Sequence, residues 1–446
     1  MLYSKLCWKA LWCCTAALSF LYLSCSNSFE FYRSVDENVS RRNYISAINE
    51  VRENRHVFGD KSSVLYNLDM GMLNHYAGEY DSSISYLFAA EKEIEDLYTR
   101  SISQQVLSFV LNDNIIPYDG EDFEKVLVNI FLALDFAQKG MNDDALVEAR
   151  KVDLKLREYA RKYDDKNTFK EDAFIRYITG VLYESNGEIN DAFISYRQSY
   201  ESYDIYSKEY GTPAPSFILD DLVRTAILLS FTDEASRYQS LGGQPYFNGT
   251  KPVGSIIVLT YTGKGPIKKQ ERPTVSIPDS AGILHTFQMA LPKFVPRYFG
   301  NTRYDVAAIS YSDTATITTE LAENITAIAE KSLNDRLAMI YLKSGGRALL
   351  KFLASEKMKS EMKKDKNETK NFLGSLAIDL VVGATEQADL RTWRTLPAQI
   401  HLARLNLPPG EYILKVNESG KNNYLKTDSV NVHSGKASFI IVDDIR

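Results

Sequence analysis

The sequence predicts a mainly α-helical chain in which a solenoid of paired helices is followed by a smaller α+β domain. One pattern of glycine, aromatic and alanine residues recurs between residues 38 and 202, and such recurrence is typical of repeat architectures. Breaker residues cluster at 242–245, and apolar residues alternate with a period of two after them, which indicates strands. We therefore expect helical repeats over residues 35–240 and an α+β domain over residues 250–446.

The composition is that of an ordinary globular protein and argues against a nucleic-acid partner. The 446 residues include 52 basic and 58 acidic side chains, which gives a net charge of -6, whereas nucleic-acid-binding domains are strongly basic. All four cysteines lie within the first 25 residues, so the chain after them can form neither an internal disulfide nor a thiolate metal site. We expect no metal ion and no cofactor.

Residues 1–24 have the layout of a secretory signal peptide. Lys5 and Lys9 precede an apolar run over residues 10–24, and Cys25 follows directly; a basic start and an apolar stretch of this length are typical of such signals. The run is shorter than the ~20 apolar residues that a membrane-spanning helix requires. We therefore expect residues 1–24 to be removed, and a permanent membrane span is the alternative.

The end of this run resembles a lipobox, the motif at which bacterial signal peptidase II leaves a lipidated cysteine. Ser24 and Cys25 match the motif, whereas Tyr22 and Leu23 stand where a leucine and a small residue are usual. The resemblance implies that Cys25 carries palmitate-type acyl chains, that residues 25–34 form a tether, and that the protein is anchored in a bacterial cell envelope. A serine after the cysteine implies the outer membrane, facing the periplasm. Ordinary cleavage near Ser24 is the alternative.

Two stretches of the first half share one spacing of small and aromatic residues. Each stretch has a glycine, a second glycine seven residues later, and apolar residues at fixed distances after it. Small residues allow two antiparallel helices to approach closely, and a glycine suits the tight turn between them. The matching positions are Gly71, Gly78, Tyr80, Leu87 and Ala90 in the first stretch, and Gly180, Tyr183, Gly187, Ala192 and Tyr196 in the second.

This spacing resembles the tetratricopeptide repeat. The resemblance implies a superhelix whose concave groove binds a peptide or protein partner. Tyr80, Tyr183 and Tyr196 are candidate contacts, because tyrosine joins an apolar ring to a polar tip. Weaker copies near residues 44–51 and 133–149 extend the array. The alternative is that the superhelix only supports the second half of the chain.

The second half alternates between strand and helix patterns. We expect one more helix over residues 217–231, then helices near 321–340 and 372–382, because apolar residues recur there at helical spacing. A turn between two paired strands is expected at residues 263–266, where glycine and proline cluster. Strands are expected at 253–261, 274–277, 284–291, 304–311, 399–404, 412–416 and 437–442.

The segment over residues 388–398 combines charge, an aromatic ring and a proline without any periodicity. It resembles a segment of uncharacterised bacterial lipoproteins that join a tetratricopeptide-like half to an α+β half. Arg391, Trp393 and Arg394 form a candidate binding site, because guanidinium groups and an indole ring suit an anionic or aromatic partner. The alternative is a structural corner with Trp393 buried.

No catalytic motif is evident in the sequence. The five histidines lack the spacing of a zinc site on one helix face, and no Gly-x-Ser-x-Gly turn is present. We expect a non-enzymatic envelope lipoprotein that binds envelope proteins as a scaffold or assembly factor. The alternative is an envelope enzyme acting on glycan or peptide, with Arg391 and Arg394 in a cleft between the two halves.

Overall fold

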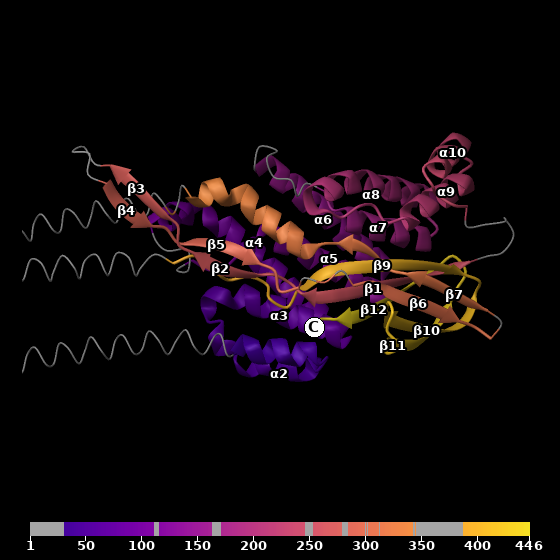
Figure 1. Cartoon of the computed structure of the whole chain (residues 1–446), viewed down its shortest axis with the longest axis horizontal. Coiled ribbons are helices and arrows are strands. Elements are labelled where there is room, and N and C mark those ends of the chain that lie inside the picture. The colour runs from indigo at the N-terminus through magenta and orange to yellow at the C-terminus, as the bar shows by residue number, and fades with distance from the viewer. Residues whose placement is uncertain are drawn as a thin grey trace, which may run out of the picture.

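The computed structural model describes residues 31–110, 116–162, 171–245, 253–278, 284–298, 300, 302–311, 313–341, 344 and 387–446. Within these ranges the first half consists of paired helices, and the second half is rich in strands with one further helix, as the sequence predicted (Figure 1). The signal peptide, Cys25 and the helix expected near 372–382 lie outside the described residues. None of the described helices has the length and apolar content needed to cross a membrane.

The helical half begins earlier than expected. Its first helix covers residues 31–40, so residues 31–34, assigned above to the tether, are helical, and Phe31 is buried against Phe58. The helices that follow are α2 (Tyr44–Glu53), α3 (Ser63–Ala77), α4 (Tyr80–Val110), α5 (Asp122–Gln138), α6 (Asn142–Lys162), α7 (Ala173–Ser185), α8 (Ile189–Tyr210), α9 (Phe217–Leu228) and α10 (Thr232–Ser240), with 3-10 turns at Arg55–Val57 and Asp60–Ser62.

The glycines of the two repeats have the roles that their spacing predicted: one allows the paired helices to approach closely, and the other forms the turn between them. A Cβ atom on Gly71 would lie 2.6 Å from the Leu87 side chain, and one on Gly180 would lie 2.5 Å from the Tyr196 ring. Any larger residue at these two positions would push the paired helices apart. The second glycine of each repeat takes the turn between its two helices with a positive φ, 75° in the first repeat and 82° in the second, a conformation that favours glycine.

Most strands of the second half form two packed four-stranded sheets. The first sheet has the order β12-β1-β9-β8, with β12 parallel to β1, and the second has the order β11-β10-β6-β7. One further helix covers residues 325–341. The strands are β1 (Gly254–Lys264), β2 (Ile267–Glu271), β3 (Thr274–Pro278), β4 (Leu284–Gln288), β5 (Leu291–Val295), β6 (Tyr304–Ile309), β7 (Thr314–Thr318), β8 (Glu320–Glu323), β9 (Pro397–Leu407), β10 (Gly410–Glu418), β11 (Tyr424–Val432) and β12 (Ala437–Asp444).

Three expectations for this half are wrong. Residues 263–266 do not join two paired strands, because β1 pairs with β9 and β12 whereas β2 pairs with β5; the chain passes there from the first sheet into the β2–β5 pair. Leu321 lies in the short strand β8 rather than in a helix, because it pairs with His401 at the edge of the first sheet. The single strand expected over residues 284–291 is wrong as well, because β4 ends at Gln288 and β5 begins at Leu291. Strands β2, β7, β8 and β11 were not predicted because they are short or polar.

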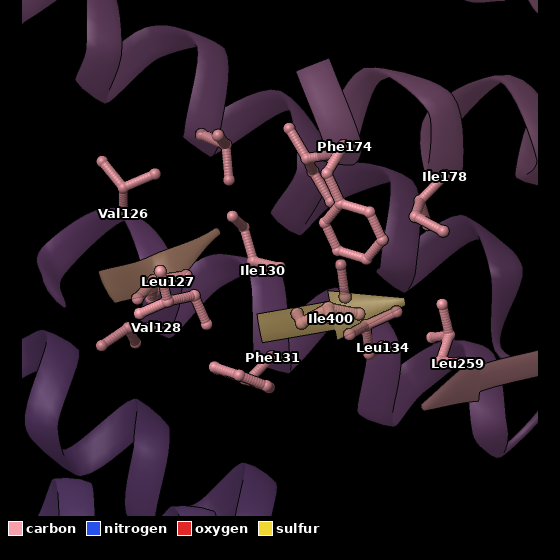
Figure 2. Packing of buried hydrophobic residues seen from close by; sticks show 14 of the residues in the cluster. Val126, Leu127, Val128, Ile130, Phe131, Leu134, Phe174, Ile178, Leu259 and Ile400 are labelled. Atoms are coloured by element: carbon pink, nitrogen blue, oxygen red, sulfur yellow. The ribbon is translucent and has the colours of Figure 1, made fainter. Parts of the chain in front are cut away.

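The helices and one face of the first sheet share a hydrophobic core, and a second core lies between the two sheets. Along β1, Ile257 and Leu259 belong to the core that the helices form, whereas Val258, between them, belongs to the core between the two sheets. Figure 2 shows Leu259 and Ile400 among side chains of α5 and α7. The first sheet is therefore sandwiched between the helices and the second sheet, and the boundary predicted near residue 245 does not separate two independent cores.

Candidate functional site

The segment over residues 387–396 leads into β9 and lies against the inner helices of the array. Trp393 is 1% exposed, and its ring meets the Phe131 ring of α5 edge-on, with centroids 5.9 Å apart. Its indole N–H donates to the hydroxyl of Thr395, 3.0 Å away. The hydroxyl of Tyr76 in α3 donates to the Thr395 carbonyl at 2.8 Å. Helices α3 and α5 therefore bind this segment of their own chain.

A buried carboxylate on α5 fixes the middle of the segment. One oxygen of Glu124 accepts from the Trp393 backbone N–H at 2.7 Å and from the Thr392 hydroxyl at 2.8 Å. The other accepts from the Tyr118 hydroxyl and from the Glu121 backbone N–H. Burial, followed by the nearby charge of Glu121, raises the pKa of Glu124. Four donors converge on this side chain, so it organises the local chain path.

A second buried carboxylate lies on α3. Asp69 accepts from the Thr395 hydroxyl at 2.9 Å and from the Tyr32 hydroxyl at 3.0 Å. Burial raises the pKa of Asp69 to about 7, although both hydrogen bonds act in the opposite direction. The first helix, α3 and the segment therefore meet at one carboxyl group, which links the start of the described chain to a segment more than 300 residues later.

The two arginines of the predicted site are already paired within the chain. Arg391 forms an ion pair with Asp389 at 2.7 Å and donates to the carbonyls of Lys61 and Ile116. Arg394 pairs with Asp36 at 3.3 Å, and its guanidinium lies 4.3 Å from the centroid of the Tyr32 ring. These contacts hold the segment to the helices, so neither arginine presents a free cation to a partner.

The six predicted contact residues do not form one site. Trp393 and Tyr196 are buried, which is incompatible with a role as a binding surface. Tyr183 lies on α7, where its hydroxyl accepts from Arg150. Tyr80 packs near the ring of His75. The segment over residues 388–398 is the structural corner that the alternative described.

Sequence analysis did not identify the charged cluster that joins the end of the array to the first sheet. Arg404 of β9 is 2% exposed and pairs with Glu184 and Asp221, each at 3.0 Å. Arg224 of α9 pairs with the same two carboxylates. Burial raises the pKa of Glu184, but the two guanidinium groups outweigh it and bring that pKa to about 2. An arginine inside a strand of apolar residues was the available signal, since buried charges are almost always paired.

A hydrogen-bonded set of three side chains lies at the centre of the core. His75 Nδ1 lies 2.5 Å from Asp135 Oδ1, and His75 Nε2 lies 2.9 Å from the Tyr261 hydroxyl. All three side chains are buried, so a substrate has no path to them, and their contacts tie α3, α5 and β1 together. Within the described ranges, no group of three or more histidine, cysteine or acidic side chains is placed to hold a metal ion.

An exposed apolar patch lies on the last helix pair. Ile227 and Leu228 end α9 and are 50% and 60% exposed, and Phe231, at the start of α10, is 41% exposed. We call these three residues the terminal patch. Solenoids usually end in a helix with a polar outer face, because an apolar end lowers solubility. An apolar end is typical of a surface that another protein covers.

Comparisons with known proteins show a likeness to solved structures. No protein-family model matches the sequence. No curated protein matches it either. The crystal structure of the apo form of RapI is similar over 48% of this chain and 52% of that one, with 15% sequence identity and a TM-score of 0.36. The chain thus spans about half the length of that protein.

Proposed function

We propose that the protein is a scaffold or assembly factor of a bacterial envelope that binds other envelope proteins through the outer surface of its helical repeats. The terminal patch is the observation that carries this proposal. The inner face of the array cannot be the binding groove, because the first sheet and the segment over residues 387–396 fill it. A partner must therefore bind elsewhere, and the apolar end of the last helix pair offers a desolvated contact.

The terminal patch fits a protein more closely than a small ligand. The Phe231 ring packs edge-on against Phe193 with centroids 5.6 Å apart, so its position is fixed before binding. Pre-positioned aromatic and branched side chains on a helix pair suit the apolar face of a partner helix. The peripheral polar residues Asp233 and Glu234 would remain in water at the rim of such an interface.

Cross-linking in living cells, followed by identification of the bound proteins, tests this function. The double variant Leu228→Glu, Phe231→Glu should lower partner recovery at least tenfold, because two carboxylates would have to be desolvated in the interface. Ile45→Glu, at a position that is 57% exposed on α2, is the matched control and should bind as the unmodified protein does. Equal recovery with the double variant and the control would contradict the proposal.

We further propose that Cys25 anchors the protein by acylation, on the outer membrane and facing the periplasm. The support is the lipobox-like end of the signal peptide, and two or more acyl chains give a stable anchor. Mass measurement of the N-terminal peptide from cells should show a thioether-linked diacylglycerol on Cys25. An unmodified Cys25, or a retained leader, would contradict the anchor without affecting the cross-linking result.

A binding role is proposed in preference to the enzymatic alternative. That alternative needs Arg391 and Arg394 to act on a substrate, and both are engaged with carboxylates or carbonyls of the chain. Hydrolysis of a glycan or peptide of the envelope by the purified protein, abolished by Arg394→Ala at unchanged stability, would favour the enzyme instead.

A further inference from the structure

A long β-hairpin leaves the first sheet and stands apart from the rest of the fold. Its proximal half is the β2 and β5 pair and its distal half is the β3 and β4 pair; we call residues 267–278 and 284–295 the arm. In Figure 1 the distal half lies at the end of the molecule farthest from the second sheet. Within the described chain, β3 and β4 are hydrogen-bonded to no other strand, and an isolated two-stranded ribbon is only marginally stable in water.

The root of the arm is fixed to the helical array. Lys268 of β2 forms a buried ion pair with Glu121. The Phe294 ring of β5 meets the Phe123 ring of α5 with centroids 5.8 Å apart. The side chain of Gln270 accepts from the Ala388 backbone N–H at 2.9 Å. The direction of the arm is thus set by the body of the protein.

The exposed residues of the arm carry an unbalanced positive charge. The strand register places Lys269 directly opposite Lys293, and like charges in this position repel each other. Lys293 is 61% exposed and pairs with Glu271 at 2.8 Å, but in the described part of the chain no carboxylate pairs with Lys269 or with the exposed Arg272. Lys268 is already paired with Glu121, and residues 269–295 contain three lysine or arginine residues and two acidic residues, a net +1, whereas the whole chain carries -6.

The distal half alternates between two kinds of residue pair. The register joins Val275 to Phe287, and the next pair joins Ser276 to Thr286. Because alternate pairs share a face of the ribbon, the pairs 275–287 and 277–285 form a mainly apolar face that includes one histidine, and the pairs 274–288 and 276–286 form a polar face. Thr286, Ser276 and Gln288 are exposed. A cationic root followed by a ribbon of this kind suits a surface that offers anionic groups above an apolar layer.

The arm and the expected lipid anchor start from neighbouring points. Arg297, two residues after β5, pairs with Asp36 of the first helix at 3.0 Å. Cys25 precedes residue 31, the first described residue of that helix, by six residues, which span at most about 20 Å. Each strand path of the arm covers 12 residues, or about 40 Å at 3.3 Å per residue. An anchored molecule can therefore bring the arm to the membrane that holds Cys25.

We propose that the arm docks on an anionic lipid surface, with Lys269, Arg272 and Lys293 at the headgroups and the distal ribbon at the edge of the apolar layer. The inference rests on the proposed anchor at Cys25. Each basic side chain near such a surface adds about 1 kcal/mol of attraction, and a second contact beside a lipid anchor fixes the orientation of the body. The terminal patch would then be held at a defined position above the membrane.

Lipid-dependent quenching in the anchored full-length mature protein tests this. Ser276→Cys, on β3, is labelled with an environment-sensitive fluorophore, and Ser429→Cys, exposed on β11, is the matched control site. Both proteins are reconstituted into vesicles of phosphatidylethanolamine with phosphatidylglycerol, which contain a nitroxide-labelled lipid. Flotation of the vesicles reports the anchor, and quenching reports the contact. We expect at least threefold stronger quenching at position 276 than at position 429.

Charge reversal identifies the headgroup contact. Lys269→Glu with Lys293→Glu should reduce quenching at position 276 at least twofold, and Lys421→Glu, 58% exposed in the second half, should leave it unchanged. In vesicles of phosphatidylethanolamine alone, quenching at position 276 should be as weak in every variant as it is in the charge-reversed variant. Equal quenching at positions 276 and 429 in protein that floats would overturn the arm contact and leave the anchor standing. Protein that does not float would overturn both, and equal quenching with and without the anionic lipid would overturn the assignment to anionic headgroups.

Discussion

The Glu124 carboxylate accepts a hydrogen bond from the Trp393 backbone N–H at 2.7 Å, and both residues are buried. This bond joins the first turn of α5 to the segment before β9, residues that are 269 positions apart. The helical array therefore does not keep an empty concave groove, because it closes on a segment of its own chain. The bond also explains why the segment has no secondary structure of its own, since its polar groups pair with the helices instead.

Glu124→Gln should destabilise the protein although the two side chains have the same shape. Every neighbour of the carboxylate is a donor, and a glutamine amide would direct two N–H groups at donors. The free energy of unfolding in urea should fall by about 2–3 kcal/mol, the cost of buried groups left without partners. Glu79→Gln, at an exposed position, is the control and should change it by less than about 0.5 kcal/mol. Equal values for the two variants would contradict the four-donor arrangement.

Trp393→Ala should leave a cavity against α5. The buried indole packs on Phe131, and truncation of a core tryptophan costs about 3–5 kcal/mol. Leu390→Ala, three residues earlier and 41% exposed, is the matched control with a small expected effect. Thermal unfolding of both variants measures the difference. If Trp393 were a contact surface instead, its loss would weaken partner recovery and leave the melting temperature unchanged.

The repeat pattern could be read from the sequence because its physical cause is local. Gly71 and Gly180 contact residues of the next helix within their own repeats, so spacing alone reveals their role. The alternation after residue 253 likewise predicts most strands of the two sheets, since one strand face lies in each core. The order of helices and strands thus follows from periods in the sequence.

The filling of the inner face could not be predicted in this way, because it depends on contacts between residues far apart in the chain. Asp69 stands alone among the apolar residues of α3, and such an isolated charge was the available signal that the helix is buried and the charge paired. Glu124 lies in the charged first turn of α5 and gave no such signal. Their partners, Trp393 and Thr395, lie hundreds of residues away. No local spacing connects them, so the segment over residues 388–398 was given an exposed role that its burial excludes.

Arg404→Met should loosen the sheet from the end of the array. The buried Asp221 and the half-buried Glu184 would lose one of their two cations, and breaking a buried pair costs about 3–5 kcal/mol. Because both halves share a core, the tyrosine-rich helices and the sheet should still unfold in one transition, seen at the same denaturant concentration by near- and far-ultraviolet circular dichroism. Arg237→Met, 62% exposed on α10, is the control. Two separate transitions in the unmodified protein would contradict the shared core.

Asp69→Asn should change how stability depends on pH. Burial raises the folded-state pKa of Asp69 to about 7 from 3.8, so between these values the folded protein binds more protons than the unfolded chain, and its free energy of unfolding falls as pH rises. An asparagine can accept from the Thr395 hydroxyl and donate to the Tyr32 hydroxyl oxygen, so it keeps both contacts without becoming charged. The free energy of unfolding of the variant, relative to that of the unmodified protein, should therefore rise between pH 5 and pH 8 by an amount on the order of 2 kcal/mol. Urea unfolding at both pH values measures this, with the exposed Asp233→Asn in parallel to subtract the effect of any lost carboxylate. A difference between Asp69→Asn and the unmodified protein that is the same at pH 5 and pH 8 would show that Asp69 does not take up its proton in this range.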